Sequence, residues 1–183
     1  MSSHRLFVAL RPPRNIRIML LEKMQGVAAA RWQSDEQLHI TLRFIGDADY
    51  HQAEDIAAAL GHFHAPPPEI QIDGVGSFEK LGRPNSLWAG LSPRPPLAAL
   101  HRKINQLLTR VGLAPETRAF LPHVTLARLG RSAGPLDGFL AVNHNLSSPA
   151  FHCEHLILYE SEMSRGGSQY HPIARFPLTA TPI

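Results

Sequence analysis

One short phrase occurs twice in this 183-residue chain, as Leu38-His39-Ile40-Thr41-Leu42 and as Pro122-His123-Val124-Thr125-Leu126. Each copy places a histidine and a threonine two residues apart among branched aliphatic residues. Because side chains alternate faces along a strand, the histidine and the threonine point one way and the aliphatic residues point the other. The sequence therefore predicts two strands that are buried on one face and present an imidazole and a hydroxyl on the other.

The elements expected around the two motifs indicate a diverged internal duplication, because each motif follows an amphipathic helix. Apolar spacing and capping residues predict helices from about residue 14 to Val27, from Asp47 or Asp49 to about His62, and from Pro95 to about Gly112. Further strands are expected at 6–10, 69–75, 86–91, 151–159 and 173–178, with a Gly- and Pro-containing stretch at 130–145. We predict two α+β lobes that each give one histidine strand to a shared cleft.

The composition is that of an ordinary globular protein and permits an anionic partner. The net charge is +3, and 15 of the 18 basic residues are arginine, which suits phosphate oxygens but is equally explained by a GC-rich genome. No apolar run approaches the ~20 residues that cross a bilayer, and the first residues lack the pattern of a secretory signal. Cys153 is the only cysteine, so an intrachain disulfide is excluded and we expect a cytoplasmic protein.

Paired imidazoles suit a reaction in which one proton is removed and another is delivered. Near neutral pH a neutral histidine can accept a proton from an attacking water or hydroxyl, while a protonated one donates to a leaving oxygen. Threonine hydroxyls beside them can hydrogen-bond the non-bridging oxygens of a phosphate. Such a pair fits the opening of a strained cyclic phosphodiester without a metal or any other cofactor.

Segments over nearly the whole chain resemble the two-histidine (2H) phosphoesterase superfamily, and in particular the RNA 2′,3′-cyclic phosphodiesterases, also called 2′-5′ RNA ligases. The resemblance rests on Arg5–Leu10, Leu38–Gly46, Gly76–Phe78, Leu87–Leu91, Phe120–Arg128, and Leu158–Ser161 with Gly166 and Tyr170 after it. It implies a bilobal fold of two pseudo-symmetric lobes of antiparallel sheet, flanked by helices around a central cleft. We expect one such domain over residues 1–183, and a monomer.

The resemblance also implies the activity and the residues that carry it. Family members open a terminal 2′,3′-cyclic phosphate of RNA to a 2′-phosphate, and some join RNA reversibly through a 2′-5′ bond. By this resemblance His39 is the general acid and His123 the general base, and Thr41 and Thr125 hold the phosphate. Two rivals stay open: a 2H enzyme for another cyclic phosphate or a 2′-5′ oligonucleotide, and an RNA-binding module without chemistry.

The strand face on which Phe44, Arg128 and Arg43 lie depends on whether each strand stays regular after the threonine of its motif. Phe44 and Arg128 each lie five residues after a motif histidine, so an ideal strand would put them on the far face unless it ends, twists or bulges after the threonine. The resemblance makes Arg128 a phosphate ligand and Phe44 a platform for base stacking, with core packing as the alternative for Phe44. The same parity places Arg43 on the face of His39, where it contacts substrate or lies at the rim of the cleft.

Other candidate sites receive less support from the sequence. Tyr170 is expected to line the substrate groove after a Gly-rich stretch that could equally be a hairpin loop. His62 with His64, or His152 with His155, lack the three or four convergent ligands of a zinc site, and His152 and His155 should face opposite ways. Cys153 is expected to face the core. We therefore expect no metal site and no membrane partner.

Overall fold

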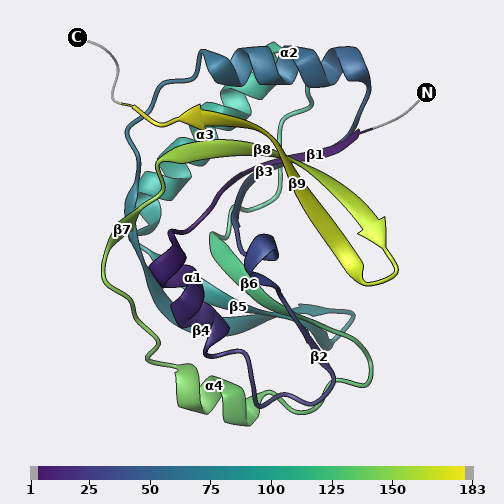
Figure 1. Cartoon of the computed structure of the whole chain (residues 1–183), viewed down its shortest axis with the longest axis vertical. Coiled ribbons are helices and arrows are strands. Elements are labelled where there is room, and N and C mark those ends of the chain that lie inside the picture. Colours follow the sequence, from purple (N-terminus) through teal and green to yellow (C-terminus); the bar gives the residue numbers. More distant parts are fainter. Residues whose placement is uncertain (1–3, 180–183) are drawn as a thin grey trace.

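The computed structural model describes residues 4–179 and shows an α+β protein with one antiparallel sheet (Figure 1). In chain order the elements are β1 (His4–Leu10), α1 (Arg14–Leu21), β2 (Ala30–Trp32), a 3-10 turn η1 (Asp35–Gln37), β3 (Ile40–Ala48), α2 (Tyr50–Gly61), β4 (Glu69–Lys80), β5 (Arg83–Ser92), α3 (Arg94–Arg110), β6 (His123–Leu129), α4 (Asp137–Asn143), β7 (Phe151–His152), β8 (His155–Ser164) and β9 (Gly167–Pro177). The expected fold class is confirmed.

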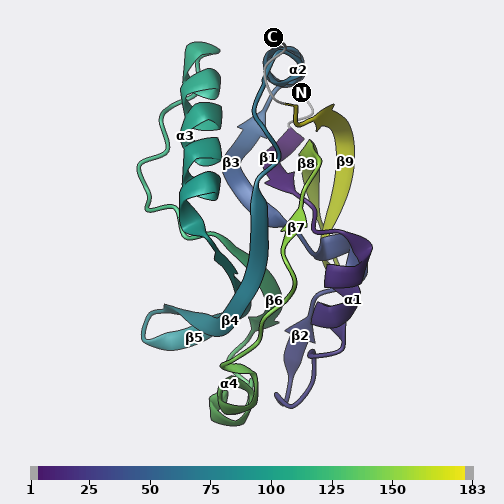
Figure 2. The same ribbon diagram turned by 90° about the vertical axis from the view of Figure 1, so that its left-hand side faces the viewer.

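The sheet has two halves that repeat the same arrangement. Its strand order is β7-β4-β5-β6-β3-β1-β8-β9, with β2 paired to the outer part of β6. Each half contains a strand–helix–strand unit, β1–α1–β3 in one half and β5–α3–β6 in the other. The second strand of each unit carries a histidine motif and pairs antiparallel with the first strand. Figures 1 and 2 place β1, β3, β8 and β9 in the upper half and β4, β5 and β6 in the lower half. The duplication predicted from the motifs therefore has a structural counterpart.

The helix boundaries follow local capping chemistry, with one difference from the sequence prediction. Asp49 caps α2, since its Oδ1 accepts a hydrogen bond from the Gln52 backbone N–H at 2.8 Å. Prolines open α3, and Gly112 follows its end with a φ of +93°. The first helix stops at Leu21 instead of Val27, because the chain turns through Gly26 at a φ of +87°. Val27 is still buried in the core, but from a loop.

Two short elements and the length of the last strand differ from the sequence prediction. The short helix α4 lies within the stretch at 130–145, where Phe139 is buried and packs against Trp32 with ring centroids 5.7 Å apart. The strand β2 pairs with β6 over only three residues. Strands β8 and β9 form a hairpin whose second strand begins at Gly167, with a φ of +110°. The last strand, Gly167–Pro177, is therefore longer than the expected 173–178. These elements depend on tertiary contacts more than on local periodicity.

Candidate active site

The two motifs meet at the centre of the sheet through one pair of residues. Ile40 of β3 pairs antiparallel with Val124 of β6, and both side chains are fully buried in the core. In an antiparallel pair the residue before one partner lies beside the residue after the other, so His39 lies next to the position of Thr125, and Thr41 next to that of His123. Since neighbouring side chains alternate faces, all four polar side chains point to the face opposite the core. They are half-buried there.

Both imidazoles are held in the same way by their own chain. The Nδ1 of His39 lies 2.7 Å from the carbonyl oxygen of Gln37, and the Nδ1 of His123 lies 2.6 Å from that of Leu121. A carbonyl oxygen only accepts, so each Nδ1 carries the proton that it donates. In a neutral ring the Nε2 is then the free acceptor. His39 Nε2 lies 3.0 Å from the Oγ1 of Thr41, which can donate to it.

Aromatic rings surround His39. The ring centroids of Phe7 and Tyr170 lie 5.0 and 5.1 Å from that of the imidazole, and Tyr159 lies 6.2 Å away. Phe7, Tyr159 and Tyr170 also pack on one another, which fixes the wall that they form. Tyr170, which the sequence placed near the groove, is thus beside a motif histidine. Phe7 and Tyr159 were missed, because they lie in the continuous apolar runs Leu6–Leu10 and Leu156–Tyr159, which show no alternation that would mark a face.

His123 has a matching wall made by the other half. Phe78 lies edge-on to its imidazole with centroids 4.9 Å apart, and Trp88 is tilted at 6.4 Å. The indole of Trp88 lies across Gly76 of the neighbouring strand, where an added Cβ would come within 2.3 Å of the ring. Gly76 is therefore required for the position of Trp88.

Burial lowers the pKa of both imidazoles. Desolvation is the main cause for His39, whose pKa falls to about 4, and the nearby cations His123, Arg128 and Arg11 lower it further, against the hydrogen bond to Gln37. The pKa of His123 is also lowered, first by burial and then by Arg128, against the hydrogen bond to Leu121. Arg128 thus acts on both rings, and an anion bound among these groups would favour the protonated imidazoles.

A β-bulge follows the threonine in each motif and reverses the strand parity. Along β3, Thr41 is opposite Ala9 and Arg43 is opposite Val8, so Leu42 is the extra residue. Along β6, Leu126 is the extra residue in the same way, between positions paired with Trp88 and Leu87. At each bulge, the carbonyl oxygen of the extra residue accepts a hydrogen bond from a group outside the β1–β3 or β5–β6 ladder. The Nδ1–H of His101 donates to Leu42 O at 2.7 Å, and the Gln33 backbone N–H donates to Leu126 O at 2.8 Å.

The bulges bring Phe44 and Arg128 to the face of the histidines. Phe44 is opposite Phe7, two residues along β1 from the partner of Thr41, and Arg128 is opposite Ser86, two residues along β5 from the partner of Thr125. A residue five positions after each histidine can therefore lie on the same face as that histidine, because the strand bulges after the threonine. Phe44 is 36% exposed, with the guanidinium carbon of Arg5 5.3 Å from its ring centroid. Core packing does not describe this side chain.

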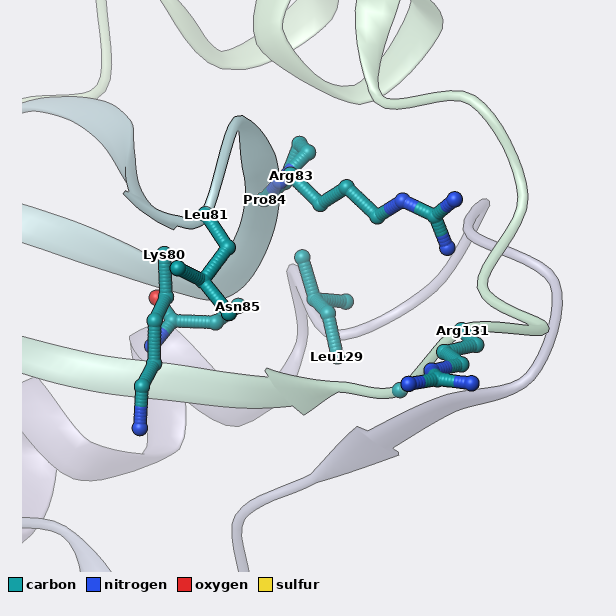
Figure 3. Close-up of a pocket in the computed structure, with 8 residues that line it drawn as sticks. Lys80, Leu81, Arg83, Pro84, Asn85, Leu129 and Arg131 are labelled. Atoms are coloured by element: carbon teal, nitrogen blue, oxygen red, sulfur yellow. The ribbon is translucent and has the colours of Figure 1, made fainter.

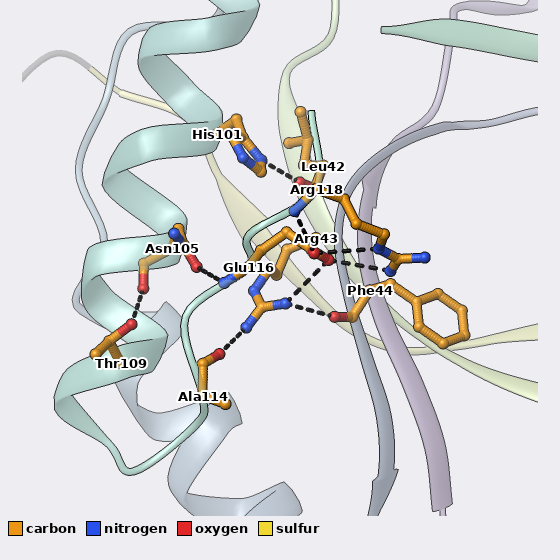
Figure 4. A network of polar contacts seen from close by, with 9 residues as sticks. All are labelled: Leu42, Arg43, Phe44, His101, Asn105, Thr109, Ala114, Glu116 and Arg118. Carbon is orange, nitrogen blue, oxygen red and sulfur yellow. Dashed lines mark hydrogen bonds and ion pairs between the residues drawn. The ribbon is translucent and has the colours of Figure 1, made fainter. Parts of the chain in front are cut away.

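The expectation that Arg43 shares the face of His39 is wrong, because the bulge at Leu42 turns it the other way. Its side chain is only 7% exposed and donates to the carbonyl oxygens of Phe44, at 2.9 Å, and Ala114 (Figure 4). It also lies 3.4 Å from Glu116, whose carboxylate accepts three hydrogen bonds from Arg118, two from its side chain and one from its backbone N–H. Those bonds lower the pKa of Glu116 to about 2, so the carboxylate is ionised. Arg43 ties β3 to the loop after α3.

Comparison with known proteins identifies the family. The sequence model of the "2'-5' RNA ligase superfamily" matches residues 12–165. The chain belongs to this superfamily. It is 27% identical to the RNA 2′,3′-cyclic phosphodiesterase of Escherichia coli K12, over 96% of this chain and 97% of that protein. It is 28% identical to the protein of that name from Geobacillus stearothermophilus, over 82% of this chain but only 48% of the relative. The chain thus spans about half the length of the latter.

The fold agrees with the same membership. A solved structure from Thermus thermophilus superposes with a TM-score of 0.80 at 23% identity, over 97% of this chain and all of the other. The resemblance to the 2H phosphoesterases that the two motifs indicated is confirmed, and the two halves of the sheet carry one motif each.

Two adjoining cavities lie next to residues that contact His39. The smaller one, of about 220 Å³, includes Gln37, Arg128 and Tyr170. A larger space next to it is lined by η1 and the start of β9. The turn η1 and the strand β9 are joined where the Gln37 side chain donates to Ser168 O at 2.7 Å. The Gly-rich stretch is thus both the β8–β9 hairpin loop and a wall next to the site.

A separate basic cavity lies away from the histidines, at the tip of the β4–β5 hairpin. It has a volume of about 410 Å³ and is lined by Lys80, Leu81, Arg83, Pro84, Asn85, Leu129, Gly130 and Arg131. Figure 3 shows Arg83 and Arg131 reaching past Leu129 on one side, while Lys80 points elsewhere. Leu129 follows Arg128 in β6 and therefore faces away from the histidines. Neither motif histidine lines this cavity.

The remaining candidates fall outside the site. Cys153 is buried, which raises its pKa to about 12 and confirms that it faces the core. Within residues 4–179 no three His, Cys, Asp or Glu side chains are grouped so as to hold a metal ion. In the same part of the chain, none of the helices has the length and apolar character needed to span a bilayer.

Proposed function

We propose that this protein hydrolyses a terminal 2′,3′-cyclic phosphate, on RNA or on a nucleotide, to a 2′-phosphate with His39 and His123 as general acid and base. The observation that carries the proposal is the matched presentation of the two imidazoles. Each Nδ1 is committed to a backbone carbonyl, and each Nε2 is directed to the face that the two motifs share across Ile40 and Val124. The names of the Escherichia coli and Geobacillus relatives support the same substrate.

In the proposed reaction a water oxygen attacks phosphorus and the bond from phosphorus to the 3′ oxygen breaks. The base, which the family resemblance makes His123, accepts the proton of the water at Nε2, and the acid, His39, donates a proton from Nε2 to the 3′ oxygen. The products are a 2′-phosphate and a 3′ hydroxyl, and the two histidines then exchange protons with solvent. A 5′ hydroxyl of a second RNA in the place of the water would give a 2′-5′ bond.

The remaining side chains of the shared face are proposed to bind the substrate. Thr41 and Thr125 would hydrogen-bond the non-bridging phosphate oxygens, and Arg128 would neutralise their charge as it builds up. Because Thr41 Oγ1 already lies 3.0 Å from the Nε2 of His39, it would turn from that nitrogen to the phosphate on binding. Phe44 and Tyr170 would contact the nucleotide, Phe44 as a stacking surface for a base. Since each proton transfer is made by an imidazole, the reaction is proposed to need no metal.

The test is phosphorus NMR of cytidine 2′,3′-cyclic phosphate and of a short RNA ending in a cyclic phosphate, with EDTA in excess. We expect the wild type to form the 2′-phosphate, and His39→Ala and His123→Ala each to lose roughly 10²- to 10⁴-fold in rate. His64→Ala, a variant of an exposed histidine, is the control and should match the wild type.

Three outcomes would contradict the proposal in different ways. Turnover that persists without both motif histidines would exclude their role as acid and base. Turnover that EDTA abolishes would show a metal-dependent reaction. Binding of the RNA without conversion of any cyclic phosphate, and with affinity unchanged by either alanine variant, would identify a binding module. Conversion of a different cyclic phosphate or a 2′-5′ oligonucleotide alone would keep the mechanism and change the substrate.

A further inference from the structure

Two arginines stand directly opposite each other beside the active-site face. Arg31 of β2 pairs with Arg128 of β6 in the antiparallel ladder, and both side chains are exposed. Side chains directly opposite in such a ladder have Cβ atoms about 4.5–5.5 Å apart, and like charges in that arrangement destabilise the sheet. An isolated three-residue strand gains little that would offset this repulsion. The pair therefore calls for an anion that binds between or above the two guanidinium groups.

The part of the protein that the structure describes supplies no such anion. Within residues 4–179 neither Arg31 nor Arg128 forms an ion pair, whereas Arg11 and Arg17 share Asp35 nearby. The cavity of about 220 Å³ that both line contains no carboxylate among the described residues. Its walls are Arg31, Trp32, Gln33, Gln37, Arg128, Met163, Gly166, Gly167, Ser168 and Tyr170. Two cations, amides and hydroxyls are the groups that bind a phosphate.

This cavity adjoins the group that surrounds His39. Gln37 contributes its side chain to the cavity and its carbonyl oxygen to the Nδ1 of His39. Tyr170 lines the cavity and lies edge-on to the imidazole, with centroids 5.1 Å apart. Arg128 lines the cavity and, after the bulge at Leu126, lies on the face of the motif histidines. An anion held by Arg31 would therefore lie on the side of the site where Gln37 and Tyr170 contact His39.

The substrate chemistry provides an anion next to the cyclic phosphate. A nucleoside 2′,3′-cyclic phosphate has a free 5′ hydroxyl, but the last nucleotide of an RNA carries a phosphodiester at the same oxygen. We propose that Arg31 binds this upstream phosphodiester, beside Arg128 at the cyclic phosphate, and that the enzyme thereby favours RNA ends over mononucleotides. This inference rests on the proposed function and assigns to Arg31 a part in selecting the substrate. Arginine suits the task because its planar fork matches two phosphate oxygens.

The experiment compares three compounds that end in the same cyclic phosphate: cytidine 2′,3′-cyclic phosphate, the dinucleotide with a natural phosphodiester, and the dinucleotide with an uncharged methylphosphonate linkage. The quantity measured is the ratio of kcat/KM for each dinucleotide to that for the mononucleotide. Arg31→Ala should lower the ratio for the natural dinucleotide by roughly 10- to 100-fold, the effect of losing a hydrogen bond to a charged group. Arg31→Lys should recover part of it. Arg102→Ala, in an exposed helix position outside the cavity, is the matched control and should leave the ratio unchanged.

Each outcome bears on one claim. An unchanged ratio in Arg31→Ala, or a wild type that prefers the methylphosphonate dinucleotide as strongly as the natural one, would overturn the proposed phosphate site. Equal losses on mononucleotide and dinucleotide would do the same, since they would place Arg31 at the cyclic phosphate itself. If no protein turns over any compound, the proposed function fails, and calorimetric binding of the natural dinucleotide then decides the site. A tenfold weaker affinity in Arg31→Ala would still support it, and equal affinities would overturn it.

Discussion

At the scale of single residues, the hydrogen bond at Nδ1 determines what each histidine can do. A carbonyl two residues earlier in the chain fixes Nδ1–H for both His39 and His123 and leaves Nε2 as the position where a proton is gained or lost. The sequence predicts the histidines but not this tautomer, because the acceptors Gln37 O and Leu121 O are backbone atoms whose direction depends on the local fold. The same carbonyls orient the rings without a carboxylate partner.

The pH dependence of the reaction follows from the lowered pKa values. One imidazole must be protonated and the other neutral, and burial places both pKa values below the ordinary 6.5, that of His39 at about 4. Because both pKa values lie below 6.5, the free enzyme has already lost most of its protonated histidine at about pH 6.5, and kcat/KM should fall by up to about tenfold per pH unit above that. Initial rates on cytidine 2′,3′-cyclic phosphate from about pH 4.5 to about pH 8.5, at constant ionic strength, measure this.

The alkaline limb of kcat should lie at higher pH than that of kcat/KM. The bound phosphate is an anion next to both rings and favours their protonated forms, which raises the pKa values in the complex. A kcat/KM profile that stays level or rises up to about pH 8 would contradict the assignment of the two imidazoles as acid and base in this environment.

At the scale of secondary structure, the paired bulges decide which side chains reach the site. One extra residue after each threonine turns Phe44 and Arg128 toward the histidines and turns Arg43 into the protein. Sequence alternation alone gives the opposite assignment for all three. The bulge at Leu42 is stabilised by His101 of α3, a residue 59 positions away, so no local pattern could reveal it.

Arg43 provides the test of this reversal. We expect Arg43→Met to lower the free energy of unfolding by about 3 kcal/mol, because Glu116 loses its buried partner and the carbonyls of Phe44 and Ala114 lose their donor. Arg118→Met removes the other partner of Glu116, but that side chain is 75% exposed, and its loss should cost less than about 1 kcal/mol. Urea denaturation compares the two variants. A stable Arg43→Met protein with a raised KM would restore the interpretation of Arg43 as a substrate contact.

At the scale of the whole molecule, the active site lies where the two halves of the sheet join. Strands β3 and β6 pair through Ile40 and Val124 alone, while the pairings on either side of them are long. The relative position of His39 and His123 therefore depends on how these two buried side chains pack. The strand–helix–strand unit of each half supplies one histidine, and only their contact completes the pair.

Packing at this junction should affect the rate more than the stability. Ile40→Val and Ile104→Val each remove one methylene from a fully buried side chain and should cost about 1 kcal/mol of unfolding free energy. Only Ile40→Val alters the packing between the motifs, and it should lower kcat by up to about tenfold, because small displacements of reacting groups are costly. Urea denaturation and steady-state kinetics of both variants test this. Equal kcat values in the two would show that the junction does not set the geometry of the pair.

The sequence by itself determined the family, the α+β class and the four polar residues of the motifs, because a repeated His-x-Thr among aliphatic residues leaves few alternatives for which face is buried. It also predicted the start of α3 to within one residue, at the prolines, and gave Asp47 or Asp49 as the cap of α2, of which the structure has Asp49. These properties depend on residues that are close together in the sequence, and not on contacts between distant segments.

Only the tertiary structure decided the rest. The bulges, the buried position of Arg43, the ring of Phe7 against His39 and the opposition of Arg31 to Arg128 all depend on partners far away in the sequence. The physical reason is that register and bulges are set by pairing between strands, and that burial, which lowers the pKa of both histidines, is a property of the packed molecule.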